Sequence, residues 1–371
     1  MNAGPLSAAG VDLDDAAGLL AADRLGLLRA ASMAGAQVRA TAAALDEGDL
    51  DAVRSDALPR TVIWLAGHGR AATAGSMLAA LLGGSVGAPI VMAAEAPPWI
   101  GALDAMIVAG DDPGDPALVT AAATGVRRGA RVIVAAPYEG PLRDATAGRS
   151  VALPPRIPVP DDFTLVRYLA AGLAALQVII PGYAVDLAAL ADALDAEAYR
   201  NSAGRELFTN PAKGLADRMR GREVVFAGDS AATLALARHA ATVMLRVGHQ
   251  SVAAAELSDA LVAIGMGWGR DAGAGEASIF HDEEIDGPLP RRTRTIVLTS
   301  DAERPVVSAR LRGFDDVQVV NANDVPDVVA PGGDNEPGSA TMPGSTGPEH
   351  QLALLALRLE MAAVYQRLVR G

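Results

Sequence analysis

The chain has 371 residues and carries 44 acidic against 31 basic side chains, a formal net charge of −13. This balance argues against nucleic acid as a partner, because phosphate backbones are bound by clustered lysine and arginine. The absence of cysteine excludes disulfides, thiolate nucleophiles, iron–sulfur clusters and cysteine-ligated zinc, and it agrees with a reducing cytoplasm.

The first part of the chain has helical periodicity. Apolar residues at helical spacing follow an acidic start and predict one or two helices up to about residue 45. No signal-peptide pattern precedes them, and the long uncharged run at 76–94 is interrupted by glycine and proline. We therefore expect a cytoplasmic protein without a membrane partner.

Short apolar runs rich in β-branched residues follow, each ending in turn residues and mostly separated by helix-like stretches. They cover residues 61–67, 88–95, 104–110 and 130–137. Apolar strands that alternate with helices predict a parallel sheet covered on both faces.

Prolines at 152–162 interrupt this pattern, and the alternation then resumes. Helices are predicted at 162–179, 184–201 and 229–245, and strands at 222–228, 294–300 and 317–323. We expect a mobile Gly-, Pro- and Ser-rich loop at 330–349, followed by a closing helix. The fold class is thus α/β, with two units at 1–182 and 183–371, each a parallel sheet between helical layers.

Gly67 and Gly69 stand between the first strand and its helix, where backbone N–H groups can approach an anion. With Ala72 and Glu95 they also fit a nicotinamide-dinucleotide fingerprint. The third interpretation is a tight turn that needs small residues whatever it binds. His68, in the same turn, is a candidate acid, base or ligand-binding group, or an ordinary polar turn residue.

Other chemistry-bearing residues have mainly structural interpretations. Ser230 follows the first strand of the second unit, where a helix cap is favoured, and Ala232 excludes a Gly-x-Ser-x-Gly nucleophile elbow. Lys213 is the only lysine, so it is the one candidate for Schiff-base or P-loop chemistry. No histidine spacing is typical of zinc, and residues 281–284 favour a solvated acidic loop over a cation site, so we expect no metal.

Several segments together resemble a known family. They are GHGRAATAG (67–75), DAMIVAGDDPGDPAL (104–118), GVRRGARVIVAA (125–136), RIPVPDDFTLVRYLAAGL (156–173), NPAKGLADRMRGREVVFAGDS (210–230) and EMAAVYQRLVRG (360–371). The chain resembles the bifunctional phosphoglucose/phosphomannose isomerases, which have two tandem sugar isomerase (SIS) domains, and in particular their divergent actinobacterial TobH-like branch. The resemblance implies a homodimer that binds a small sugar or sugar phosphate and needs no cofactor.

The loop after the third strand departs from the family. Where the family has a Ser-Tyr-Ser-Gly-Asn-Thr type sequence that holds the sugar's phosphate, residues 109–114 read Ala-Gly-Asp-Asp-Pro-Gly. Asp111 and Asp112 would stand near the dianion, and like charges about 4 Å apart cost roughly 4 kcal/mol at an effective dielectric constant of about 20. Arginines such as Arg70, Arg127, Arg128 and Arg143 are candidates to neutralise this loop, and the sequence leaves open whether they do so.

The family's catalytic groups are also missing. Arg246 or Val247 replaces its catalytic glutamate, Asp259 replaces its ring-opening histidine, and its C-terminal lysine has no counterpart. Aldose–ketose isomerisation needs a positioned base to move a proton between C1 and C2. His249 and Glu256 lie close in sequence to the lost groups and are candidate substitutes.

Three hypotheses follow. We place first a SIS-type protein that binds a carbohydrate derivative and is catalytically degenerate. The alternatives are an active phosphoglucose/phosphomannose isomerase with rearranged catalytic residues and a nicotinamide-dependent oxidoreductase. The candidate ligand-binding residues are Gly67, His68, Gly69, Arg70, Asp111, Asp112 and Ser230, and the candidate catalytic residues of an active enzyme are His249 and Glu256.

Overall fold

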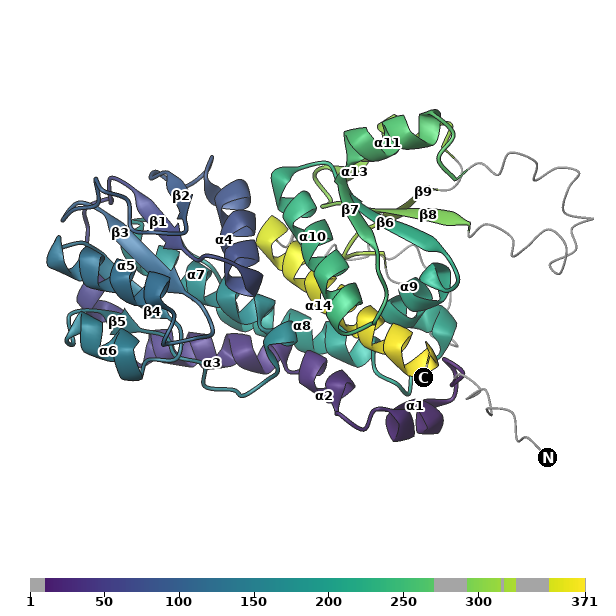
Figure 1. The fold of residues 1–371 in the computed structure, drawn as a ribbon, viewed down its shortest axis with the longest axis horizontal. Helices are drawn as coiled ribbons and strands as arrows, with labels where there is room; N and C mark the ends of the chain where they lie inside the picture. The colour runs from purple at the N-terminus through teal and green to yellow at the C-terminus, as the bar shows by residue number, and fades with distance from the viewer. Residues whose placement is uncertain (1–10, 270–291, 315–316, 325–346, 371) are drawn as a thin grey trace, which may run out of the picture.

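The computed structural model describes residues 11–269, 292–314, 317–324 and 347–370. They form two parallel sheets, each flanked by helices, and the two units lie side by side (Figure 1). No helix in these ranges is long and apolar enough to cross a membrane.

The first sheet contains the four predicted strands and a short fifth one. Its strands are β1 (Val62–Leu65), β2 (Ile90–Ala93), β3 (Ala105–Ala109), β4 (Arg131–Ala135) and β5 (Val151–Ala152). The helices around it are α4 (Gly69–Leu82), α5 (Pro116–Arg127), α6 (Gly140–Thr146) and α7 (Leu165–Ile179). The strand order is β2-β1-β3-β4-β5, and every pair is parallel.

Alternate residues of these strands face opposite helical layers. Trp64 and Ile107 belong to the core formed with α4 and α7, whereas Met106 and Val132 belong to the core formed with α5 and α6. Because side chains alternate across a strand, an almost uniformly apolar strand can serve both layers. The predicted three-layer arrangement is therefore confirmed for this unit.

Small residues allow two helices to approach Trp64, a large buried aromatic side chain of this unit. A Cβ atom at Gly75 of α4 would lie 2.2 Å from Cδ1 of Trp64, and one at Gly172 of α7 would lie 2.7 Å from its Cζ3. Neither position can accept a larger residue without displacing the indole. This packing agrees with the low aromatic content of the chain.

The second sheet repeats the pattern with four parallel strands in the order β7-β6-β8-β9. Its strands are β6 (Glu223–Gly228), β7 (Ala253–Glu256), β8 (Thr293–Leu298) and β9 (Val317–Val320). Its helices include α9 (Pro211–Met219), α10 (Ala231–Arg246), α11 (Leu257–Gly265) and α13 (Arg304–Arg310). Sequence reasoning missed β7, because alanine is a weak strand former.

The N-terminal segment forms three helices rather than the one or two that we predicted. They are α1 (Ala16–Ala22), α2 (Leu27–Ser32) and α3 (Ala34–Asp46). Gly26, at a φ of +65°, separates the first two, and the Asp23 carboxylate accepts N–H groups of the second. Short 3₁₀ helices lie at η1 (Asp51–Val53), η2 (Asp161–Phe163) and η3 (Leu207–Thr209).

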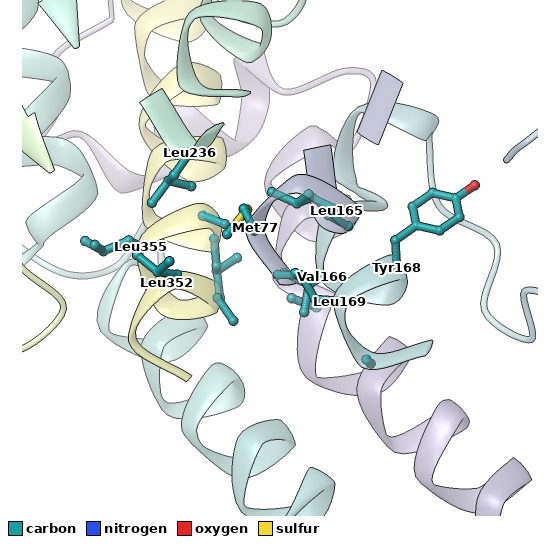
Figure 2. Close-up of a cluster of buried hydrophobic side chains, with 14 of the residues drawn as sticks. Met77, Leu165, Val166, Tyr168, Leu169, Leu236, Leu352 and Leu355 are labelled. Carbon is teal, nitrogen blue, oxygen red and sulfur yellow. The ribbon is translucent and has the colours of Figure 1, made fainter. Parts of the chain in front are cut away.

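The two units share one hydrophobic core. Helix α3 packs against α7 and α8 (Leu187–Arg200), α4 packs against α10, and α14 (Pro348–Arg370) contacts helices of both units. Figure 2 shows part of this core, with labelled side chains from α4, α7, α10 and α14: Met77, Leu165, Val166, Leu169, Leu236, Leu352 and Leu355. The predicted boundary at residues 182 and 183 falls in the connection between α7 and α8.

Candidate functional site

The strand order locates the point at which each sheet can bind a ligand. In the first sheet β2 and β3 lie on opposite sides of β1, and in the second sheet β7 and β8 lie on opposite sides of β6. Open parallel sheets bind ligands at such switch points, outside the carboxyl ends of the strands. We call the turns at residues 66–70 and 110–115 the first carboxyl edge, and those at 228–230 and 299–301 the second.

The turn after β1 is open. Gly67, His68 and Gly69 are exposed, and a Cβ atom added at either glycine would meet nothing within 4 Å. Gly69 has a φ of +71°, which favours glycine. His68 is the N-cap residue of α4, and no described side chain caps this helix. The first N–H groups of α4 thus lack a side-chain acceptor, the arrangement that binds anions at helix N-termini.

Arg70 turns away from this open turn and into the protein. It is buried, and its Nη2 donates to Oδ1 of Asp162, which also accepts from Nε of Arg246 at 2.7 Å. The three residues tie the first turn of α4 to η2 and to the last residue of α10. Arg70 therefore serves in a contact between the two units.

The same contact places the two carboxyl edges far apart. Each edge lies at the N-terminus of its helix, α4 or α10, yet the end of α10 meets the start of α4 through Asp162. The second edge is thus one helix length away, about 24 Å for the 16 residues of α10. One chain cannot combine groups from both edges around one small ligand.

The acidic loop after β3 is partly neutralised, by an arginine outside the set considered from the sequence. Oδ1 of Asp111 accepts from the Tyr168 hydroxyl and, at 3.2 Å, from Nη2 of Arg167, which stacks 4.0 Å from the Tyr168 ring centroid. Burial raises the pKa of Tyr168 above its ordinary value, so the hydroxyl remains a donor. Asp112 is exposed, and among described contacts its carboxylate accepts a single hydrogen bond, from the N–H of Gly114 at 2.7 Å.

Arg167 is the functional residue that sequence reasoning missed. It lies 56 residues after Asp111, on α7, and no local pattern links the two. Its Nε and Nη1 atoms are buried and have no described hydrogen-bond partner. The only available signal was that an arginine in the apolar helix 165–179 needs an acidic partner.

At the second carboxyl edge, side chains of the protein itself bind the polar groups that a ligand could otherwise contact. Ser230 caps α10 in a capping box with Thr233, in which Oγ of Ser230 accepts the Thr233 N–H at 3.2 Å, so the predicted cap is confirmed. Asp229 pairs with Arg310. Ser300 donates to Glu303 at 3.0 Å, and the described polar groups here largely satisfy one another.

The two proposed catalytic residues lie at opposite ends of β7. Glu256 is the last residue of the strand, is exposed, and lies beside Gly228 at the second carboxyl edge. His249 precedes the strand, and its Nε2 lies 3.3 Å from Nη1 of Arg367. The structure does not bring these residues together or place either one at the first carboxyl edge.

Lys213, the single lysine, has a structural role, because its ammonium group is bound by backbone carbonyls. It is buried, and its Nζ donates to the carbonyl oxygens of Ala203 at 2.8 Å and Arg205 at 2.6 Å. Burial lowers its pKa, although Asp14 and Asp12 oppose this effect. No group of three His, Asp or Glu residues among those described could hold a metal, and the 281–284 segment lies outside them.

Comparisons with solved structures identify the fold. The chain aligns with a Clostridium difficile 630 protein proposed to be a phosphosugar isomerase (TM-score 0.60, 10% identity, 92% of each chain). It also aligns with tagatose-6-phosphate ketose/aldose isomerase of Escherichia coli (0.56, 14%, 98% and 97%). A glucose-6-phosphate isomerase like protein of Thermus thermophilus gives 0.51 at 20% identity over 97% and 96%.

No protein-family model matches the sequence, and no curated protein matches it. The structural alignments show that the chain has the two-unit SIS fold of phosphosugar isomerases. The predicted fold class is thus confirmed. The dinucleotide interpretation receives no support, because the β2-β1-β3-β4-β5 order is that of flavodoxin-like sheets and differs from the 3-2-1-4-5-6 order of dinucleotide-binding sheets.

Proposed function

We propose that this protein binds a sugar phosphate or a related carbohydrate derivative at the first carboxyl edge and is catalytically degenerate as an isomerase. The observation that carries the proposal is the exposed glycine turn over the uncapped N-terminus of α4. Side chains cap the corresponding helix in the second unit, and also α5, where Asp115 accepts the Ala117 N–H at 2.8 Å. An anion from outside is the partner that α4 lacks.

In the folded protein, the acidic loop repels an anionic ligand less strongly than its number of aspartates suggests. Arg167 offsets the charge of Asp111, so Asp112 and the helix-capping Asp115 are the loop carboxylates without a described cation. Because Asp112 is exposed, water screens its repulsion to about 1 kcal/mol at 4 Å.

The placement of ionisable groups supports the absence of catalysis. Glu256 lies at the distant second edge, and His249 lies before β7 rather than at its carboxyl end. Among described residues, His68 is the only imidazole in the open turn, and it has no described acidic partner to orient it. A proton transfer between two sugar carbons would rest on this single side chain, which is the alternative of a rearranged active isomerase.

The test is calorimetric titration with fructose 6-phosphate and mannose 6-phosphate, with a coupled isomerase assay on the same preparation. We expect binding in the micromolar to low millimolar range and no turnover. Gly67→Glu should weaken binding at least fivefold relative to the isosteric Gly67→Gln, because both side chains enter open space and only the first adds negative charge.

Two results would contradict this proposal. Equal affinities of the Gly67→Glu and Gly67→Gln variants, or no binding by the wild type, would remove the first carboxyl edge as the ligand site. Turnover would establish the active-isomerase alternative, and loss of that turnover in His68→Gln would identify its base.

The proposal also covers the family branch, the cellular compartment and the oligomeric state of the protein. We place the chain in the TobH-like branch of the phosphoglucose/phosphomannose isomerases, in the cytoplasm, and as a homodimer. The separation of the two edges supports a dimer, since a second chain is what could bring further groups to the first edge. Light scattering at micromolar concentration should give twice the 37.7 kDa chain mass, and a monomer would exclude the dimer.

A further inference from the structure

A group of arginines without described ion-pair partners lines a cavity at the amino end of the second sheet. This cavity has a volume of about 670 Å³ and begins where β6 and β7 start, at Glu223 and Ala253. It therefore lies at the end of the sheet opposite to the second carboxyl edge. No residue of the first carboxyl edge lines it.

Three arginines line this cavity, Arg220, Arg222 and Arg370, against a single carboxylate, Glu223. None of the three makes an ion pair with a described residue, so their charges remain available to a ligand. In a chain with a net charge of −13, three arginines around one cavity form a local excess of positive charge. We call this cavity the arginine pocket.

The other lining groups add hydrogen bonding and an aromatic ring. His249 and Gln250 follow α10, and Trp268 follows α11. His249 has a φ of +50°, a conformation that non-glycine residues adopt rarely and that is found disproportionately at ligand-binding sites. Its imidazole lies 3.3 Å from Arg367, which adds a fourth guanidinium close to the pocket wall.

We propose that the arginine pocket binds a small polyphosphate, such as pyrophosphate or the phosphate chain of a nucleotide. Several separate guanidinium groups match several phosphate groups, since arginine donates in pairs to phosphate oxygens. The volume lies within the range of small-molecule sites, and Trp268 offers a face for a base or sugar ring. This site is independent of the sugar-phosphate site proposed above.

The experiment titrates the full chain with pyrophosphate and with ATP by calorimetry, while Trp268 fluorescence is followed against a Trp268→Phe control. We expect sub-millimolar binding of both probes that weakens as salt is raised, because salt screens the charges. We also expect ATP to quench a signal that is absent from Trp268→Phe. Quenching distinguishes a nucleotide, whose ring contacts the pocket, from a bare polyphosphate.

The double variant Arg220→Gln/Arg222→Gln should lose at least tenfold in affinity for both probes. These side chains make no ion pair with a described residue, so the fold should persist, and circular dichroism checks this. Arg29→Gln/Arg127→Gln removes the same charge from exposed helix positions and should bind like the wild type. Gly67→Glu should also leave both affinities unchanged, which separates this site from the first carboxyl edge.

Failure of either probe to bind at up to about 5 mM would overturn the proposal, because a sub-millimolar site would be largely occupied at that concentration. Unchanged affinity in Arg220→Gln/Arg222→Gln would overturn it as well. Loss of affinity in Gly67→Glu would show that the probes occupy the first carboxyl edge instead.

Discussion

Two neighbouring aspartates of one loop have different roles in the folded protein. Both are exposed, but the Asp111 carboxylate is bound by Arg167 and Tyr168, whereas the Asp112 carboxylate accepts a backbone N–H. The charge of the loop cannot be counted from its letters, because the compensating cation comes from α7. The charge of Asp111 is offset within the protein, so it repels an anionic ligand less than the charge of Asp112 does.

Removal of that carboxylate should strengthen phosphate binding. We expect Asp112→Asn to bind fructose 6-phosphate about fivefold more tightly, because about 1 kcal/mol of repulsion at 4 Å in water is lost. Calorimetry at low salt measures the change, which should shrink as the salt concentration rises. Asp56→Asn, an exposed substitution before β1 and so at the opposite end of the sheet, should leave the affinity unchanged. Weaker binding by Asp112→Asn would mean that the carboxylate contacts sugar hydroxyls.

At the scale of elements, the first strand–turn–helix segments of the two units differ at the helix N-terminus. Ser230 caps α10 with its own hydroxyl, and α4 begins after a glycine turn without such a cap. The sequence already contained this difference, because a serine stands at one N-cap and a histidine at the other. A capped helix has fewer free N–H groups to offer a ligand.

Loss of the Ser230 cap should lower the stability of the protein and leave its affinity for sugar phosphates unchanged. We expect Ser230→Ala to lower the free energy of unfolding by about 1 kcal/mol, the usual cost of removing an N-cap hydroxyl. Urea denaturation should show an earlier midpoint with an unchanged slope. Ser258→Ala, in the first turn of α11 where no side-chain cap exists, is the control. Lost fructose 6-phosphate binding in Ser230→Ala would instead assign Ser230 to the ligand.

The strands and helices themselves were largely predictable. The runs at 61–67, 104–110 and 130–137 became β1, β3 and β4, because buried parallel strands need continuous apolar, β-branched sequence. Those that were missed, β5 and β7, are a two-residue strand and an alanine-rich strand. Both depend on pairing with a neighbour already in place rather than on their own residues.

At the scale of the whole molecule, α14 packs against helices of both units, and buried charged groups fix it within the second unit. Nε of Arg358 donates to Oε1 of Glu197 on α8 at 2.7 Å, and its Nη atoms donate to the carbonyls of Asn321 and Ala322 after β9. A second buried pair on α14 joins Glu360 to His239 of α10, with 3.0 Å between Oε1 and Nε2. The closing helix thus links segments that lie far apart in the chain.

Neutralisation of Glu197 should destabilise the whole fold. Burial opposes its ionisation, but Arg358 and Arg200 outweigh burial and hold the pKa of Glu197 below its ordinary value of 4.5. Glu197→Gln leaves Arg358 buried beside a neutral amide, so we expect a loss of about 3–5 kcal/mol at pH 7, measured by urea denaturation. Glu139→Gln, an exposed substitution on the first unit, should change little.

The pH dependence gives an independent check of the same ion pair. A depressed folded pKa contributes stability that is full above about pH 4.5 and is lost as the pH falls through the folded value. The difference in stability between the wild type and Glu197→Gln should therefore narrow below pH 4.5. A constant difference down to pH 3 would show that Glu197 is not ionised in the folded protein.

The sequence by itself determined the α/β class, most strands and helices, the helix cap at Ser230 and the glycine turn after β1. These features depend on residues a few positions apart, whose spacing decides periodicity and whose side chains bond to nearby backbone. Only the tertiary structure decided that Arg167 offsets Asp111, that Arg70 joins the two units, and that His249 and Glu256 lie at opposite ends of one strand. Such pairings follow from how separate elements pack, and spacing along the chain carries no record of that geometry.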